Sequence, residues 1–259
     1  MRFAMLGSGS RGNATLVQSG DTTVLVDCGF MLRECERRLE LFGVKPWDLS
    51  AIVVTHEHFD HIGGVARLAR KHKLPVFMTK GTHEGWKHAP VPRTTIFDPA
   101  DPFTVGALQI EPVPVPHDAR EPCHYVLGNG SFRVGVLSDA GAATDGMREA
   151  LSGCDALLLE FNHDVEMLIN GPYKPPLKQR IASAVGHLSN VQSAALLASL
   201  DNSRLKHLVL THLSEKNNTP ELALAAARGA LKEKGSQSFS NPELVCANQD
   251  GGLAWRTLQ

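Results

Sequence analysis

Short runs with alternating apolar and polar residues recur along the whole chain, and helical patterns lie between them. The alternation predicts strands at 2–6, 14–18, 22–27, 51–56, 74–78, 107–115, 123–128, 132–139, 156–161, 207–212, 243–247 and 252–258. Helices are predicted near 31–42, 62–72, 144–152, 176–185, 190–200 and 219–234. Tight turns such as SGDT (19–22) and GNGS (128–131) favour hairpins. Strand–helix–strand units favour helices on outer faces, so we expect an α/β fold of two packed mixed sheets.

Composition adds limits to this picture. The 259 residues are 42% hydrophobic, and no long Pro/Gly/Ser tract divides them, so we expect a single domain over 1–259. The net charge of -1 gives no general basic field. Any affinity for nucleic acid would therefore come from a local patch.

The chain carries neither an export pattern nor a spanning segment that we can recognise. The apolar run in MRFAMLGSGS is shorter than that of a signal peptide, and no other run approaches the roughly 20 residues of a membrane helix. The five cysteines are scattered without a C-x-x-C pair, which suits free thiols. We therefore expect a cytoplasmic location and no membrane partner.

Histidine is the unusual residue type, with 12 copies. The segment VVTHEHFDHIGG (53–64) follows an apolar strand and holds His56, His58, Asp60 and His61 in the spacing H-x-H-x-D-H. Residues two apart in extended backbone point the same way, so His56 and His58 can converge on one point. Asp60 and His61 can face a second point beside it. Imidazole and carboxylate suit zinc, manganese or iron, so the segment predicts a pair of metal sites.

Four ligands cannot complete two sites, and matching residues follow other strands. These are His117, Asp139 and His212, each at the end of an apolar run. The two oxygens of Asp139 can bridge two cations, and His117 and His212 would complete one site apiece. Asp27 ends another strand, and we expect it to orient a ligand histidine or the H-x-H-x-D-H loop through hydrogen bonds. The sequence thus predicts two divalent ions at a shared rim.

With these residues in place, the chain resembles the metallo-β-lactamase-fold hydrolases, and most closely their YycJ/WalJ-type group of bacterial nuclease-like proteins. The shared stretches are GSGSRGN (7–13), THEHFDHIGG (55–64), HDAREP (117–122), SDAG (138–141), LEFNHD (159–164), NGPYKPPLKQRI (170–181), GHLSN (186–190) and THLSEKNN (211–218). The resemblance implies a four-layered αβ/βα sandwich, a binuclear centre at one edge and exonuclease activity on DNA from the 5′ end. Cys123, His124 and the tripeptide KPP (174–176) depart from the group's pattern, which leaves the substrate preference open.

A pair of cations suggests a mechanism. Two metals about 3.5–4 Å apart can hold a bridging hydroxide as the nucleophile and stabilise charge on a phosphoryl oxygen. The expected reaction is therefore phosphodiester hydrolysis, with Asp60 counted among both the ligands and the catalytic residues. His187 and His163 are alternative proton donors to the leaving group, and Glu160 can orient one of them.

Further residues near these motifs are candidates for substrate contacts. They are Ser8, Ser10 and Asn13 in the glycine-rich turn, Ser214 and Asn217 after His212, Lys178 with its basic neighbours Lys174, Arg180 and Lys216, and Tyr173 or Trp86 as stacking surfaces. Turn formation, helix capping, a solvated basic face and core packing explain them as readily. The turn GSGSRG also matches the dinucleotide pattern G-x-G-x-x-G, but a strand follows it instead of a helix, so we interpret it as a turn between strands.

Two other classes of function compete with a DNA exonuclease. The same centre could hydrolyse small phosphodiesters or other small esters. A non-catalytic metal-dependent regulator or a redox protein is the third possibility, although a flavin-dependent redox enzyme would need a further domain. The native metal, the choice between DNA and RNA, the strand polarity and the oligomeric state are not readable from these residues.

Overall fold

The computed structural model describes residues 1–87, 91–233 and 241–259. The first of its two sheets consists of β1 (Arg2–Gly7), β2 (Ala14–Ser19), β3 (Thr22–Val26), β4 (Ala51–Val53), β5 (Val76–Thr79), β6 (Thr94–Phe97) and β14 (Leu253–Thr257). Its strand order is β14-β1-β2-β3-β4-β5-β6. The last strand of the chain therefore pairs with the first, which ties the two ends of the described chain into one sheet.

The second sheet mirrors this plan. It consists of β7 (Phe103–Val105), β8 (Leu108–Pro114), β9 (Cys123–Gly128), β10 (Arg133–Leu137), β11 (Ala156–Glu160), β12 (His207–Thr211) and β13 (Glu243–Cys246). The order is β13-β12-β11-β10-β9-β8-β7. Each sheet combines antiparallel hairpins with a parallel run, β3 to β6 in the first and β10 to β13 in the second.

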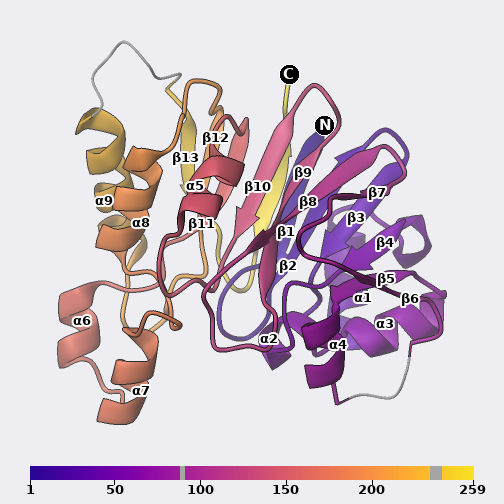
Figure 1. Cartoon of the computed structure of the whole chain (residues 1–259), viewed down its shortest axis with the longest axis horizontal. Helices are drawn as coiled ribbons and strands as arrows, with labels where there is room; N and C mark the ends of the chain where they lie inside the picture. The colour runs from indigo at the N-terminus through magenta and orange to yellow at the C-terminus, as the bar shows by residue number, and fades with distance from the viewer. Residues whose placement is uncertain (88–90, 234–240) are drawn as a thin grey trace.

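Helices cover both outer faces (Figure 1). They are α1 (Leu32–Leu41), the 3-10 turn η1 (Pro46–Asp48), α2 (Phe59–Ile62), α3 (Val65–His72), α4 (Lys80–Gly85), α5 (Asp145–Leu151), α6 (Val165–Asn170), α7 (Pro175–Ile181), α8 (Asn190–Ser199) and α9 (Pro220–Glu233). The expected four-layered αβ/βα sandwich is confirmed. No helix in the described ranges is long and apolar enough to span a bilayer.

Three apolar layers hold the sandwich together. Phe3, Tyr125 and Leu158 belong to the layer between the sheets. Leu39 of α1 and Leu68 of α3 pack on the outer face of the first sheet, and α5, α8 and α9 pack in the same way on the second. Strands with apolar residues on both faces are buried from both sides, which explains the continuous apolar runs in β3, β4, β11 and β12.

The strands predicted from alternation are present, and the differences concern short elements. β6 and β7 were not predicted, because four and three residues carry too little periodicity at the sheet edges. The short helices α2, α4 and α6 were also missed, and the helix expected over 62–72 begins at Val65. The helix expected over 176–185 ends at Ile181, and position 234 of the helix expected over 219–234 lies outside the described residues.

The topology decides where chemistry can gather. β3 and β4 end at the same edge of the first sheet because they are parallel. β8, β10, β11 and β12 end together in the second sheet, since β8 and β10 both run antiparallel to β9. Figure 1 shows α2 at this edge of the sandwich, with α4 to one side of it and α7 to the other.

Candidate metal centre

The H-x-H-x-D-H segment leaves β4 and turns at once into the short helix α2. His56 and His58 precede the helix, and His58, its N-cap residue, has extended backbone with φ -65° and ψ 145°. Asp60 and His61 lie inside α2 and point from the helix instead of the strand. The change of backbone between His58 and Phe59 therefore divides the four side chains into two pairs.

The later strand ends bring the remaining candidates to the same place. His117 follows β8, Asp139 follows β10 and His212 follows β12, and all three are buried. Ligand atoms that lie within 4.8 Å of one another form four groups, which are His56–His58–His117, His56–His61–Asp139, Asp60–His61–His212 and Asp139–Glu160–His187–His212. Asp139 belongs to two groups and stands between the halves. The seven ligands expected from the sequence therefore converge on one centre.

Atom positions within the centre fit cations. His58 Nδ1 and His117 Nε2 lie 3.2 Å apart, close to the roughly 3.3 Å between two nitrogens that share one tetrahedral zinc. His212 Nε2 lies 3.6 Å from Asp60 Oδ2. Buried His56 Nε2 and His212 Nε2 have no hydrogen-bond partner, although burying such groups unpaired is costly. Buried nitrogens without a hydrogen-bond partner that face other candidate ligands fit a metal site, because a cation would satisfy them.

Hydrogen bonds orient the ligand rings from behind. Asp27 Oδ2 lies 2.8 Å from His61 Nδ1, and the same carboxylate accepts the N–H and the hydroxyl of Thr55 at 2.8 Å each. His117 Nδ1 lies 3.0 Å from the carbonyl oxygen of Gly186. A carboxylate or carbonyl on one ring nitrogen holds the proton there and leaves the other nitrogen free for a metal. Asp27 thus makes the contact expected of it.

Glu160 is the acidic hub of the C-terminal half. It is fully buried at the end of β11, and its Oε2 accepts the backbone N–H groups of Ala140 and Leu188 at 3.0 and 3.1 Å. Its Oε1 lies 2.9 Å from His187 Nδ1 and 3.3 Å from His212 Nδ1. The predicted acid–histidine pair between Glu160 and His187 is therefore present as a contact.

Charge divides the centre into two electrostatic halves. Burial disfavours the imidazolium of His56 and of His117, and the pKa of each lies below its usual value. Burial acts in the same direction on His212 and His187, but nearby carboxylates outweigh it. Asp139, with Asp60 and Glu160, raises the pKa of His212 to about 10, and Glu160 with Asp139 raises that of His187 to about 9. The carboxylates in this half stabilise positive charge. In the metal-free protein that charge is carried by the protonated rings of His187 and His212.

A pocket of about 160 Å³ opens directly beside His187 and His212. Its apolar wall consists of Leu177, Ile181 and Leu213, and its polar lining consists of Ser10, Asn162, Tyr173, Arg180 and Ser214. Arg180 Nη2 donates to Asp118 Oδ1 at 2.9 Å. Asp118 in turn follows the ligand candidate His117, so the pocket rim and the metal centre share an ion pair.

The structure brings only some of the expected substrate contacts to this pocket. Ser10, Tyr173 and Ser214 line it. Ser8, Asn13 and Asn217 are buried instead. Ser8 Oγ accepts the N–H of His212, Asn13 Nδ2 lies 3.1 Å from His61 Nε2, and the N–H of Asn217 donates to Ser214 Oγ. None of the three lines the pocket, and these contacts are made within the protein, although Asn217 Oδ1 has no hydrogen-bond partner.

Three other expectations also change. Lys178 Nζ donates to the carbonyl oxygen of Ile169, which turns it away from the pocket. Trp86 packs in the core beside the first sheet. His163 is buried with Nδ1 3.3 Å from Asn162 Oδ1, and burial lowers its pKa to about 4. It belongs to none of the four ligand groups. Sequence reasoning missed Asn162 and Leu177, because nothing in LEFNHD or KPPL shows which side chains face inward.

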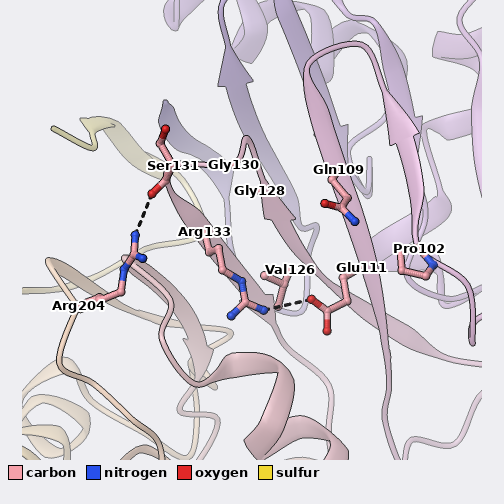
Figure 2. A pocket seen from close by; sticks show the side chains of 9 residues that line it. All are labelled: Pro102, Gln109, Glu111, Val126, Gly128, Gly130, Ser131, Arg133 and Arg204. Carbon is pink, nitrogen blue, oxygen red and sulfur yellow. Dashed lines mark hydrogen bonds and ion pairs between the residues drawn. The ribbon is translucent and has the colours of Figure 1, made fainter.

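A second hollow of about 200 Å³ lies at the other end of β9 and β10 (Figure 2). Two arginines line it. Arg133 Nη2 donates to Glu111 at 3.1 Å, and Arg204 Nη2 donates to Ser131 and to both oxygens of Asp155. Figure 2 shows Arg133 turned to Glu111 and Arg204 turned to Ser131. Because these donors are engaged and none of the ligand groups found among the described residues lies there, we place the candidate functional site at the histidine-rich edge.

Comparisons with known proteins agree with this fold and this edge. Residues 22–213 match the family described as the beta-lactamase superfamily domain, and the chain belongs to this family. Over 239 residues it is 38% identical to the exodeoxyribonuclease YycJ of Bacillus anthracis, covering 91% of this chain and 90% of the relative. The exodeoxyribonuclease WalJ of Streptococcus pneumoniae is 36% identical over 228 residues, covering 86% of this chain and 85% of the relative.

Solved structures support the fold alone. The metallo-beta-lactamase fold protein YhfI from Bacillus subtilis superposes with a TM-score of 0.74 over 99% of each chain, at 23% identity. The resemblance to the metallo-β-lactamase-fold hydrolases and to their YycJ/WalJ-type group is therefore confirmed.

Proposed function

We propose that the protein is a two-metal phosphodiesterase that removes nucleotides from DNA, beginning at the 5′ end. The observation that carries this proposal is the convergence of seven imidazole and carboxylate ligands beside a small pocket at one edge of the sandwich. Both relatives described above, which align with most of this chain, are named exodeoxyribonucleases. A metal-dependent hydrolase agrees with the family, the donor set and the unpartnered nitrogens.

The ligand set divides between two cations. His56, His58 and His117 would hold one, and Asp60, His61 and His212 would hold the other, with Asp139 between them. Zinc, manganese and iron all accept such nitrogen and oxygen donors. When bound, the metals act as Lewis acids that activate water and polarise a phosphoryl oxygen. We propose two ions because each of these two groups contains only three of the seven candidate ligands.

His187 is placed to move a proton. Its Nδ1 hydrogen points to Glu160 Oε1, so Nε2 is the ring atom left for the pocket, which His187 lines. In the metal-free protein Glu160 and Asp139 raise the pKa of this ring to about 9, so both of its nitrogens hold a proton at neutral pH. In the metal-loaded enzyme Nε2 would be the atom that donates a proton to a leaving oxygen. We therefore assign the general-acid role to His187 rather than to buried His163, with Glu160 as its positioning residue.

The pocket sets the scale of the substrate. Its volume of about 160 Å³ is below the 300–1,000 Å³ that is typical of sites for drug-sized ligands. It therefore suits one terminal unit of a chain rather than a continuous strand, which favours removal from an end. Arg180 lies at the rim, where it is paired with Asp118. Phe59, 65% exposed between His58 and Asp60, offers a surface on which a base can stack.

The same small volume also favours a second candidate, hydrolysis of small phosphodiesters. Such substrates would fill the pocket without needing Phe59 or any surface beyond the rim.

The described cysteines are all free, which suits a reducing compartment, and we propose a cytoplasmic location on this ground.

One experiment separates the two candidates. Chelator-treated protein reloaded with Mn²⁺ or Zn²⁺ is incubated with single-stranded and duplex DNA labelled at either end, with RNA, and with bis-p-nitrophenyl phosphate. We expect immediate release of the 5′ label as mononucleotide, and a loss of activity in Asp60→Ala. Asp145→Ala is the matched control, because Asp145 is an exposed acid on α5. Cleavage of the small ester without cleavage of any polymer would establish the second candidate, and no cleavage by metal-loaded protein would refute both.

A further inference from the structure

Three residues of the metal centre share an unusual backbone conformation. Asp27, Asp139 and His212 have φ values of 61°, 48° and 54°, and Lys73 is the only other non-glycine residue with positive φ in the described chain. Lys73 simply ends α3. A residue with a side chain in this region costs on the order of 1–3 kcal/mol and persists only where its surroundings hold it. The strained residues therefore need a cause.

At His212 the cause is visible. Strand β12 ends at Thr211, and both backbone polar groups of His212 are taken by side chains from distant segments. The N–H of His212 donates to Ser8 Oγ at 2.8 Å, and Asn162 Nδ2 donates to the carbonyl oxygen of His212 at 2.9 Å. Ser8 is 4% exposed and Asn162 is 6% exposed, so water competes little with either bond.

This backbone conformation directs the imidazole. His212 Nδ1 lies 3.2 Å from Asp139 Oδ1, and its unpartnered Nε2 lies 3.6 Å from Asp60 Oδ2. Relaxation of φ to the usual negative range would turn the Cα–Cβ bond away from these carboxylates. The two backbone bonds therefore decide whether Nε2 of His212 reaches the other ligands.

The turn that supplies Ser8 also reaches the other sheet. Asn13, at the end of the same β1–β2 turn, accepts the N–H of Gly9 at 2.9 Å and lies 3.3 Å from Asp60 Oδ2 and 3.1 Å from His61 Nε2. One rigid turn thus contacts ligands of the H-x-H-x-D-H segment through Asn13 and His212 through Ser8. We therefore interpret the glycine-rich β1–β2 turn as a support for these candidate ligands and not as a dinucleotide-binding loop.

We propose that Ser8 and Asn162 are positioning residues that hold His212 in its left-handed conformation and thereby set the affinity of the second cation site. This inference rests on the proposed role of His212 as a metal ligand. Asn162 lines the pocket, but the hydrogen bonds given above join neither residue to the first ligand group, His56, His58 and His117. Their effect is therefore confined to the group Asp60, His61 and His212.

The test measures metal binding by calorimetric titration of chelator-treated protein with Mn²⁺ and with Zn²⁺. In Ser8→Ala and Asn162→Ala we expect the affinity of one site to fall by about 10- to 100-fold, the usual effect of losing a group that supports a ligand, while the other site is unchanged. Ser8→Thr keeps the hydroxyl and should restore binding. Asn202→Ala is the matched control, because buried Asn202 donates in the same manner to the carbonyl of Leu197 at 2.8 Å, before the start of β12.

Each outcome decides a separate question. Wild-type protein that binds neither metal would refute the proposed function. Wild-type protein that binds two ions, with Ser8→Ala and Asn162→Ala binding them equally well, would overturn the positioning role alone. Equal weakening of both sites, or the same weakening in Asn202→Ala, would also overturn it, since that is a general loss of structure. Thermal unfolding of the metal-free variants identifies unfolded protein, and if Asn162→Ala does not fold, the Ser8→Ala and Ser8→Thr pair decides.

Discussion

Replacing Glu160 by glutamine removes one oxygen from the most densely bonded carboxylate of the centre. The side chain is fully buried, and its two oxygens face four nitrogens, two on the backbone and two on histidines. Glutamine offers one acceptor oxygen and one NH₂ donor. In the wild type each carboxylate oxygen faces two N–H groups. Whichever way the glutamine amide turns, its NH₂ group will face two of these N–H groups, and those two hydrogen bonds will be lost.

The size of the effect follows from these contacts. A hydrogen bond to a charged group contributes about 1.5–3 kcal/mol, so losing two should lower the free energy of unfolding of the metal-free protein by about 3–6 kcal/mol. If the amide nitrogen faces His212 and His187, the Nδ1 atom of each ring must become an acceptor. His212 would then carry its proton on Nε2, the atom that faces Asp60, and the affinity for metal should fall by about 10- to 100-fold.

Urea unfolding of chelator-treated protein and metal titration measure the two effects. Glu243→Gln is the matched control, because Glu243 also lies 3.0 Å from a histidine Nδ1, that of His207, but its side chain is 42% exposed. Exposed ion pairs contribute about 0–1 kcal/mol, so this control should unfold close to the wild type. A Glu160→Gln protein whose free energy of unfolding falls by less than about 1 kcal/mol would refute our account of the hub. Metal affinity equal to that of the wild type would show that the amide nitrogen faces the backbone of Ala140 and Leu188 instead of the histidines.

Three further predictions concern the rim, the titration and the fold. Phe59→Ala should raise KM for DNA by about 5- to 150-fold, because about 1–3 kcal/mol of stacking is lost, and should leave KM for bis-p-nitrophenyl phosphate unchanged. Trp47→Ala is the control, because it removes an aromatic ring of similar exposure, 68% against 65%. An equal loss on both substrates would argue against stacking. Since the pKa values of His212 and His187 are raised to about 10 and 9, the stability from their pairs with carboxylates is full below pH 6.5 and is lost as the pH rises through 9 to 10. The urea midpoint of metal-free protein should therefore be lower at pH 10 than at pH 7, and equal midpoints would contradict this. Buried Arg38 donates to the carbonyls of Leu6 and Gln249 at 2.6 and 2.9 Å. Arg38→Met should therefore lower the free energy of unfolding by about 3–5 kcal/mol without changing metal affinity. An unaltered urea midpoint would show that these bonds contribute little.

Much of the candidate centre was accessible from the sequence because its candidate ligands follow strands. An apolar run that ends in a histidine or an aspartate places that residue at a sheet edge, and parallel strands end at the same edge. His117, Asp139 and His212 were found by this reasoning although they lie far from His56 in the chain. The spacing H-x-H-x-D-H likewise indicated two pairs of ligands, and the turn into α2 separates those pairs.

The substrate contacts followed no such rule. Ser8 and Asn13 lie in a turn whose polar residues could face either solvent or protein, and the sequence gives no periodicity for a turn. Their direction was decided by groups more than 40 positions away, the backbone of His212 and the side chains of Asp60 and His61. Lys178 was misassigned for the same reason, because one helical position separates the face that lines the pocket from the face that meets Ile169.

Local patterning by itself therefore determined the strands, the helices and the ligand candidates of this protein, because apolar periodicity and strand ends are properties of neighbouring residues. Only the tertiary structure decided which polar side chains serve the ligands and which face the pocket. A hydrogen bond between Ser8 and His212, or between Asn162 and the carbonyl of His212, joins segments whose distance in space depends on how the two sheets pack. That packing is a sum over the whole core, and no short stretch of sequence contains it.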